Sequence, residues 1–195
     1  MELIFATNNK HKIREISDLL DNRFKILGLA DVSITDDIPE DADNLADNAL
    51  YKARYVHERT GMNVFADDTG LEVNALDGAP GVHSARYAGA DKNPDDNIIK
   101  LLKELEGSTN RKARFRTVIA LIFDKREYLF EGKVEGEIIQ NRKGTGGFGY
   151  DPVFMAKGYD KTFAEIPLSE KNKISHRAQA MKKLLAFLAQ QPVSQ

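Results

Sequence analysis

The sequence NVFADDTGLEVNA, residues 63–75, places a short apolar run directly before two adjacent carboxylates. Its beginning reads as a buried strand, the segment from Asp67 to Gly70 as a polar turn, and its end as a half-buried strand. Ligand sites in α/β proteins gather at the carboxyl ends of sheet strands, which is where Asp67 and Asp68 stand. Because successive side chains of a strand point in opposite directions, we expect one carboxylate to face a ligand and the other to be tied to backbone or to a neighbouring cation.

Strands and helices interleave on both sides of this stretch. A strand at 3–6 precedes a polar turn and a helix whose apolar residues, from Ile13 to Leu20, repeat at helical spacing. This order predicts a single α/β domain over residues 1–195, with a mixed, twisted central sheet flanked by helices. The other predicted segments are helices at 44–60, 94–106 and 174–190, strands at 113–123, 127–138 and 153–155, a loop at 77–94 and a frayed tail at 191–195.

Composition excludes several classes of function. The 195 residues carry a net charge of −2, so the chain lacks the positive field that nucleic-acid binding without sequence preference requires. The chain contains no cysteine, which removes disulfides and thiolate chemistry, so a metal would have to bind oxygen or imidazole. The apolar runs at 118–123 and 184–189 are far shorter than a membrane span, and the N-terminus lacks the pattern of a secretory signal. We expect a cytoplasmic protein with no membrane or nucleic-acid partner.

Several segments favour a phosphate-rich ligand. The polar turn Thr7-Asn8-Asn9 precedes a helix start that carries Lys10, His11 and Lys12, where the helix dipole is already positive, so the segment favours an anion. A second acidic cluster begins at Glu40, and carboxylates from two places suit Mg²⁺. Together these features predict a polyphosphate pocket with magnesium. Further cations that could line it are Lys52, Lys171, His176 and Arg177.

The most glycine-dense part of the chain is residues 144–151. Glycines allow the backbone to approach a ligand closely, and Phe148 or Tyr150 offers a ring on which a flat base could stack. The segment matches neither the dinucleotide-binding nor the Walker fingerprint. Without a histidine pair at metalloprotease spacing or a serine elbow, attack by a metal-activated water is the chemistry that remains.

The chain contains five motif blocks, at residues 7–12, 65–73, 78–89, 146–152 and 168–177. They resemble the signature blocks of the inosine/xanthosine triphosphate pyrophosphatases. The resemblance runs from residue 3 to about 185. It implies two lobes with the active cleft between them, and hydrolysis of non-standard purine nucleoside triphosphates such as ITP, dITP and XTP to the monophosphate and pyrophosphate. It also implies Mg²⁺ as cofactor and a homodimer.

Position by position, the resemblance assigns a role to each matching residue. Asp68 would be general base and metal ligand, Glu40 a further metal ligand and Asp67 a supporting carboxylate. The groups implied to hold the triphosphate are Thr7, Asn8, Asn9, Lys10, His11, Lys12, Lys52, Thr69 and Lys171. Those implied to surround the base and ribose are Phe148, Gly149, Tyr150, Asp151, His176 and Arg177.

Some choices stay open at this point. Asp68 or its neighbour Asp67 could orient and deprotonate the water. The donor that reads the six-position carbonyl of the purine could be His176, Arg177 or a backbone N–H after Gly147. The competing functions are a pyrophosphatase acting on pyrimidine or guanine triphosphates, and a nucleotide-binding regulatory module without chemistry.

Overall fold

The computed structural model describes residues 1–19 and 24–191. The chain divides into two compact units. Unit 1 comprises the described parts of 1–68, 117–132 and 177–195, and unit 2 comprises 69–116 and 133–176. Leu20 and most of the predicted tail, residues 192–195, lie outside the described residues.

Unit 1 is built around parallel strands. Strand β1 (Glu2–Phe5) pairs in parallel with β2 (Lys25–Leu27) and, through Ile4 opposite Val64 and Phe5 opposite Phe65, with β3 (Val64–Val73). The side chains of these strands alternate between two cores, because residues two apart along a strand share a face.

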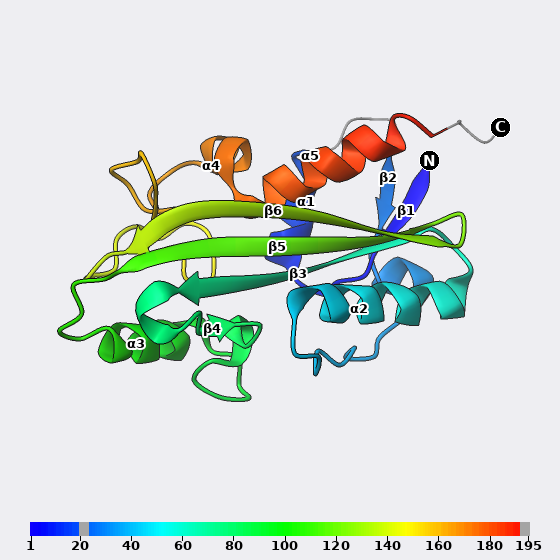
Figure 1. The fold of residues 1–195 in the computed structure, drawn as a ribbon. Helices are drawn as coiled ribbons and strands as arrows, with labels where there is room; N and C mark the ends of the chain where they lie inside the picture. Colours follow the sequence, from blue (N-terminus) through cyan, green and yellow to red (C-terminus); the bar gives the residue numbers. More distant parts are fainter. Residues whose placement is uncertain (20–23, 192–195) are drawn as a thin grey trace. The chain divides into compact units, whose positions relative to one another are not determined.

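Helices cover each of the two faces in unit 1. Helix α2 (Leu45–Thr60) packs on the face that carries Val64 and Ala66, whereas α1 (Lys10–Ser17) and α5 (His176–Leu188) pack on the face that carries Phe65 (Figure 1). The α2-side core contains Ile4, Ala6, Ala49, Ala53, Val56, Val64, Ala66, Ala120 and Ile122. The α5-side core contains Leu3, Phe5, Ile16, Phe65, Ile119, Leu121, Met181 and Leu184.

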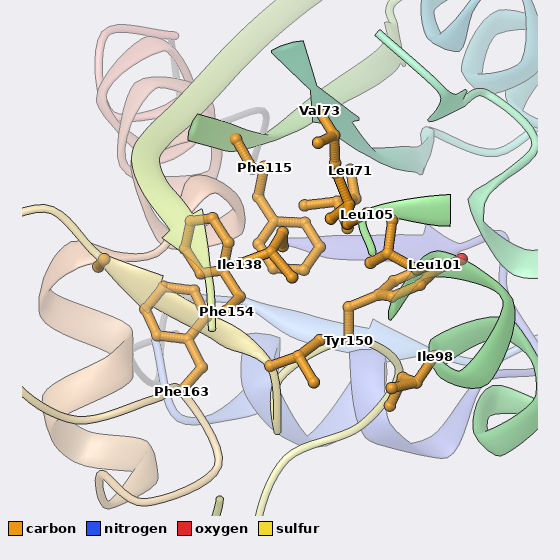
Figure 2. Packing of buried hydrophobic residues seen from close by; sticks show 13 residues of the cluster. Leu71, Val73, Ile98, Leu101, Leu105, Phe115, Ile138, Tyr150, Phe154 and Phe163 are labelled. Carbon is orange, nitrogen blue, oxygen red and sulfur yellow. The ribbon is translucent and has the colours of Figure 1, made fainter. Parts of the chain in front are cut away.

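Unit 2 has a core of its own, rich in aromatic rings. Figure 2 shows Phe115, Phe154 and Phe163 in this unit 2 core, with Leu101 and Tyr150 in the same cluster. The Phe115 and Phe154 rings meet edge to face at 4.7 Å between centroids, a geometry that aromatic pairs favour. The unit also contains the elements β4 (Pro80–Gly81), α3 (Pro94–Glu104), β7 (Phe154–Ala156) and α4 (Leu168–Ile174).

Two long strands contribute residues to both units. Strands β5 (Lys112–Phe123) and β6 (Arg126–Ile138) are joined by Asp124 and Lys125, which both have positive φ, as the favoured two-residue hairpin turn requires. Over the described residues the strand order is β2-β1-β3-β5-β6-β7, with β4 antiparallel to β3 and β7 antiparallel to β6. The predicted fold class, a mixed sheet flanked by helices, is confirmed.

Two predictions about individual elements were wrong. The expected turn at Asp67–Gly70 lies inside the continuous strand β3, because cationic partners from neighbouring helices compensate the buried carboxylates. The predicted loop at 77–94 contains strand β4 and a 3₁₀ turn at Ser84–Arg86. The predicted helix at 174–190 is present as α5, which begins two residues later because Ser175 is extended; the separate helix α4 before it was not predicted.

Strand β2 and two further 3₁₀ turns, Ala30–Val32 and Asn74–Leu76, gave no signal strong enough to be predicted. Each is only three residues long, too short for a hydrophobic period to be read. No described helix has the length and apolar character that a membrane span needs.

Candidate active site

The adjacent carboxylates of β3 face opposite sides of the sheet in unit 1. Asp67 lies on the same face as Phe65, two residues before it, and points toward α1 and α5, where it contacts Lys12 and Arg177. Asp68 follows the parity of Ala66 and points toward α2. The predicted division, with one carboxylate tied to cations, is confirmed for Asp67.

Asp67 is clamped between two cations. Lys12 Nζ lies 2.9 Å from Oδ1, and Arg177 Nε donates to Oδ2 at 3.1 Å. Arg177 also donates through Nη1 to Glu15, so the guanidinium is shared by two buried carboxylates. Burial alone would raise the pKa of Asp67, but the charges of Lys12, Arg177 and Lys52 outweigh it and hold the pKa below its usual range. Asp67 therefore stays ionised.

Asp68 has a different environment although it is the next residue. Its Oδ2 accepts a hydrogen bond from Asn48 Nδ2 at 3.0 Å, and the nearest cation, Lys52 Nζ, lies 3.8 Å from Oδ1. Burial raises the pKa of Asp68 above its ordinary value, although Lys52 and Lys12 act in the opposite direction. Of the two carboxylates, Asp68 is the better proton acceptor.

Lys52 connects the second acidic segment to the strand. Its Nζ donates to Glu40 Oε1 at 2.5 Å and to the Asp67 backbone oxygen at 2.7 Å. Burial lowers the pKa of Lys52, but Asp68, Glu40 and Asp67 outweigh this and raise it above its ordinary value. The ammonium therefore stays charged between Glu40 and Asp68.

Glu40 and Asp68 form a donor pair suited to magnesium. They come from separate segments, and both approach the same ammonium group, at 2.5 and 3.8 Å, so this place already accommodates positive charge. Magnesium commonly takes only one or two protein carboxylates and completes its coordination with water and phosphate oxygens. The donor set therefore fits the predicted cofactor. Among the described residues, no group of three or more carboxylate, imidazole or thiol side chains could hold a metal.

The start of α1 is capped by its own sequence. Asn9 Oδ1 accepts from the backbone N–H groups of His11 at 3.0 Å and Lys12 at 3.3 Å, and Thr7 Oγ1 accepts from Asn9 N at 3.2 Å. Asn9 therefore caps the helix. The first turn carries no acidic residue, so Lys10, His11 and Lys12 keep the helix start positive.

A second group of predicted residues lies together in unit 2. Asp151 Oδ2 accepts from the Phe148 backbone N–H at 2.8 Å and from Lys171 Nζ at 2.6 Å, and Lys171 is buried. Its Nζ also lies 5.1 Å from the centroid of the Phe148 ring. Gly147 has φ +70°, and a side chain there would collide with the Asp151 carboxylate. The Asp151 carboxylate therefore fixes the backbone at Gly147 and Phe148.

The other predicted base-side residues differ in their surroundings. The Tyr150 ring is buried in the unit 2 core and its hydroxyl donates to the Ser84 backbone oxygen at 2.8 Å, so Tyr150 offers no free face for stacking (Figure 2). His176 is buried and stacks on Phe115, with 4.6 Å between ring centroids.

The predicted residues thus fall into two groups. In unit 1 the structure brings together Lys12, Glu40, Lys52, Asp67, Asp68 and Arg177, beside the turn of Thr7, Asn8, Asn9, Lys10 and His11. Unit 2 holds Thr69, Phe148, Gly149, Tyr150, Asp151, Lys171 and His176.

Sequence reasoning missed Asn48 and Glu15. Both are buried polar residues that contact predicted site residues. Helical spacing was a usable signal, because Asn48 lies four residues before Lys52 and Glu15 lies three after Lys12, so each shares a helix face with a predicted residue.

A cavity of about 700 Å³ in unit 2 contains none of the predicted site residues. Arg111 lines it, and its guanidinium donates to the backbone oxygens of Leu105, Ile138 and Ile139. These bonds tie Arg111 to the fold rather than to a ligand.

The sequence and the fold are similar to those of known proteins. The family model described as the Ham1 family matches residues 3–187. The chain belongs to the Ham1 family. Two similar Ham1 relatives, each named a dITP/XTP pyrophosphatase, come from Flavobacterium johnsoniae and Porphyromonas gingivalis. The first is 53% identical over 96% of this chain and 98% of its own length, and the second is 56% identical over 96% and 97%.

Solved Ham1 structures share the architecture. A HAM1 protein from Coxiella burnetii matches with a TM-score of 0.90 and 38% identity, covering 98% of this chain and all of its own. The Ham1 protein of Staphylococcus aureus gives a TM-score of 0.88 at 38% identity, covering 97% of this chain and 98% of its own.

Proposed function

We propose that this Ham1-family chain hydrolyses non-standard purine nucleoside triphosphates, such as ITP, dITP and XTP, to the monophosphate and pyrophosphate, and so removes them from the nucleotide pool. The names of its full-length relatives, at about half identity, support the reaction class. The observation that carries the proposal is the unequal treatment of two neighbouring carboxylates. Two cations contact Asp67 at 2.9 and 3.1 Å, whereas Asp68 accepts a hydrogen bond from the neutral Asn48 amide and lies 3.8 Å from Lys52.

In the proposed reaction Asp68 orients a water molecule and takes its proton. The water oxygen forms a bond to the α phosphorus, the bond between that phosphorus and the bridging oxygen breaks, and pyrophosphate leaves with the bonding electron pair. Asp67 remains ionised and fixes Lys12 and Arg177. Lys12 and Lys52 supply charge for the phosphates.

Glu40 and Asp68 would hold magnesium in this proposal. A bound magnesium ion supplies positive charge that neutralises phosphate oxygens. Lys52, which contacts Glu40 and lies near Asp68, would keep the two carboxylates together before the ion arrives.

Discrimination against adenine must act at the six-position carbonyl of the purine, whereas discrimination against guanine, which shares that carbonyl, must act at its two-amino group. Arg177 donates to Asp67 and Glu15, and the Phe148 N–H donates to Asp151, so these groups act as positioning groups. We assign the donor to His176 or to the backbone N–H groups after Phe148. A site that hydrogen-bonds the correct base rejects a mismatched one by about 10⁴ to 10⁵ in kcat/KM.

The decisive experiment measures pyrophosphate and phosphate release from a panel of triphosphates, with and without Mg²⁺. We expect pyrophosphate from ITP, dITP and XTP only with magnesium, and far slower release from ATP and GTP. Faster turnover of a pyrimidine or guanine triphosphate would support the related pyrophosphatase instead. Binding without magnesium-dependent turnover would identify a regulatory module.

The proposal includes a cytoplasmic homodimer. Sedimentation at twice the mass of one chain would support the dimer, and sedimentation at the mass of one chain would contradict it.

A further inference from the structure

Asn48 is a buried polar residue for which the reaction outlined above gives no role. Asn48 lies near the start of α2, one helical turn before Lys52, and only 1% of its surface is exposed to solvent. An amide side chain buried this deeply must have its hydrogen bonds satisfied, or it destabilises the fold. Its partners therefore explain its presence.

The two ends of the Asn48 amide contact two different parts of the candidate site. Nδ2 donates to Asp68 Oδ2 at 3.0 Å, and Oδ1 accepts from the Ala42 backbone N–H at 3.0 Å. Ala42 lies two residues after Glu40. Because the amide group is planar, the bond at one end fixes the direction of the other.

We propose that Asn48 is a positioning residue that sets the Asp68 carboxylate and the Glu40 segment in register for catalysis. This inference rests on the proposed function. Asn48 and Lys52 lie on one face of α2, and each side chain makes two hydrogen bonds. Asn48 joins Asp68 to the Ala42 backbone. Lys52 joins Glu40 to the Asp67 backbone. The helix thereby carries the relative placement of both carboxylates.

The chemistry of the amide explains why this position holds asparagine. A lysine or arginine here would pair with Asp68 as Lys12 and Arg177 pair with Asp67, and would compete for the charge that a proton or a dication needs. An apolar residue would leave the Ala42 N–H without its acceptor. A neutral group that donates at one end and accepts at the other orients Asp68 without adding a second cation to Lys52, which lies 3.8 Å away.

The test compares Asn48→Ala with Asn44→Ala as a matched control. Asn44 caps the same helix by accepting from Asp47 N at 2.9 Å, and it is exposed. Its replacement should lower the midpoint of unfolding, because a helix cap is lost, while kcat stays unchanged. For N48A we expect kcat for ITP to fall about 10- to 100-fold, as for other residues that orient metal ligands, with KM changing less than about threefold.

A third variant separates the two halves of the amide. Asn48→Asp keeps the size of the side chain and the acceptor for Ala42, but it turns a carboxylate toward Asp68 in place of a donor. We expect N48D to lose kcat as N48A does. Parental kcat in N48D would show that anchoring Ala42 is the whole role and would overturn the inference. N48D also serves if N48A does not fold.

A readout without nucleotide completes the design. Calorimetric titration with Mg²⁺ alone should show weaker binding to N48A than to the parent and to N44A. Parental kcat and parental Mg²⁺ binding in N48A would overturn the inference, as would a loss of kcat that is equal in N48A and N44A. If the parent itself hydrolyses no triphosphate, the proposed function fails, and the Mg²⁺ titration still tests Asn48.

Discussion

Asp67 and Asp68 are chemically identical residues that their partners make different. Asp67 touches two cations and stays ionised, whereas burial beside a neutral amide raises the pKa of Asp68. Spacing alone could predict that the two would differ, because a strand alternates its side chains. It could not say which was which, since that depends on the helices that pack on each face.

Replacing Asp68 tests the assignment of the base. Asp68→Asn keeps the size of the side chain but removes the proton acceptor, so kcat for ITP should fall by about 10² to 10⁴. Binding of ITP, measured by calorimetry before turnover is significant, should persist. Turnover by D68N at the parental rate in the presence of magnesium would refute the assignment.

Replacing Asp67 should affect stability more than D68N does. Asp67→Asn removes the carboxylate shared by the half-buried Lys12 and the buried Arg177, and breaking a buried ion pair costs about 3 to 5 kcal/mol. Urea unfolding of D67N, D68N and the parent measures this difference. Equal midpoints for the two variants would contradict the pairing.

Tyr150 gives the protein a pH-dependent contribution to stability. Burial raises the pKa of Tyr150 above its ordinary value of about 10, so at higher pH the phenol ionises more readily in the unfolded chain than in the folded one. Its contribution is thus fully present below pH of about 10 and is lost as pH rises toward the folded pKa. Tyr150→Phe should lose less stability than the parent between pH 9 and about 11, which thermal unfolding at several pH values would measure. Parallel curves would rule this out.

At the scale of elements, the ends of helices could be predicted better than the strand through the site. Asn44 and Gly61 bound α2 as the sequence indicated, because capping is a local property. The segment at Asp67 to Gly70 was read as a turn because its composition is polar, and only partners far along the chain make it a strand. The helix predicted at 174–190 corresponds to α5, whereas the seven-residue helix α4 before it was missed.

Gly61 provides a test of the helix end. It has φ +67°, and a side chain there would meet nothing within 4 Å, so the cost of Gly61→Ala comes from the backbone alone. We expect a loss of about 1 kcal/mol in the free energy of unfolding. Gly61→Asn should lose less, since asparagine tolerates the left-handed region better. An alanine variant as stable as the parent would show that α2 ends differently in solution.

At the scale of the whole molecule, residue patterns predict the fold class, whereas two lobes were expected only from the family resemblance. The alternation of strands and helices predicts a mixed sheet, whereas both units draw on several separate segments, which no local pattern marks. Each unit has its own core. The single domain over residues 1–195 stays a prediction.

The shared strands make that prediction testable. Since β3, β5 and β6 contribute residues to both units, we expect one cooperative unfolding transition. Leu101→Ala in the unit 2 core and Leu184→Ala in the α5-side core should each lower stability by about 2 to 5 kcal/mol and move the same transition. Hydrogen exchange resolved by segment would reveal two separate transitions if the units unfold independently.

Because side chains alternate between the two faces of the sheet along β3, the number of residues before Asp67 decides which face each carboxylate occupies. Inserting one amino acid between Phe65 and Asp67 would swap the faces of the sheet on which the two carboxylates lie. Asp67 would then face Asn48, and Asp68 would face Arg177. A point substitution alters one side chain, whereas such an insertion would exchange the environments of both carboxylates at once. Length changes are therefore far less tolerable here than at the surface turn of Asp124 and Lys125.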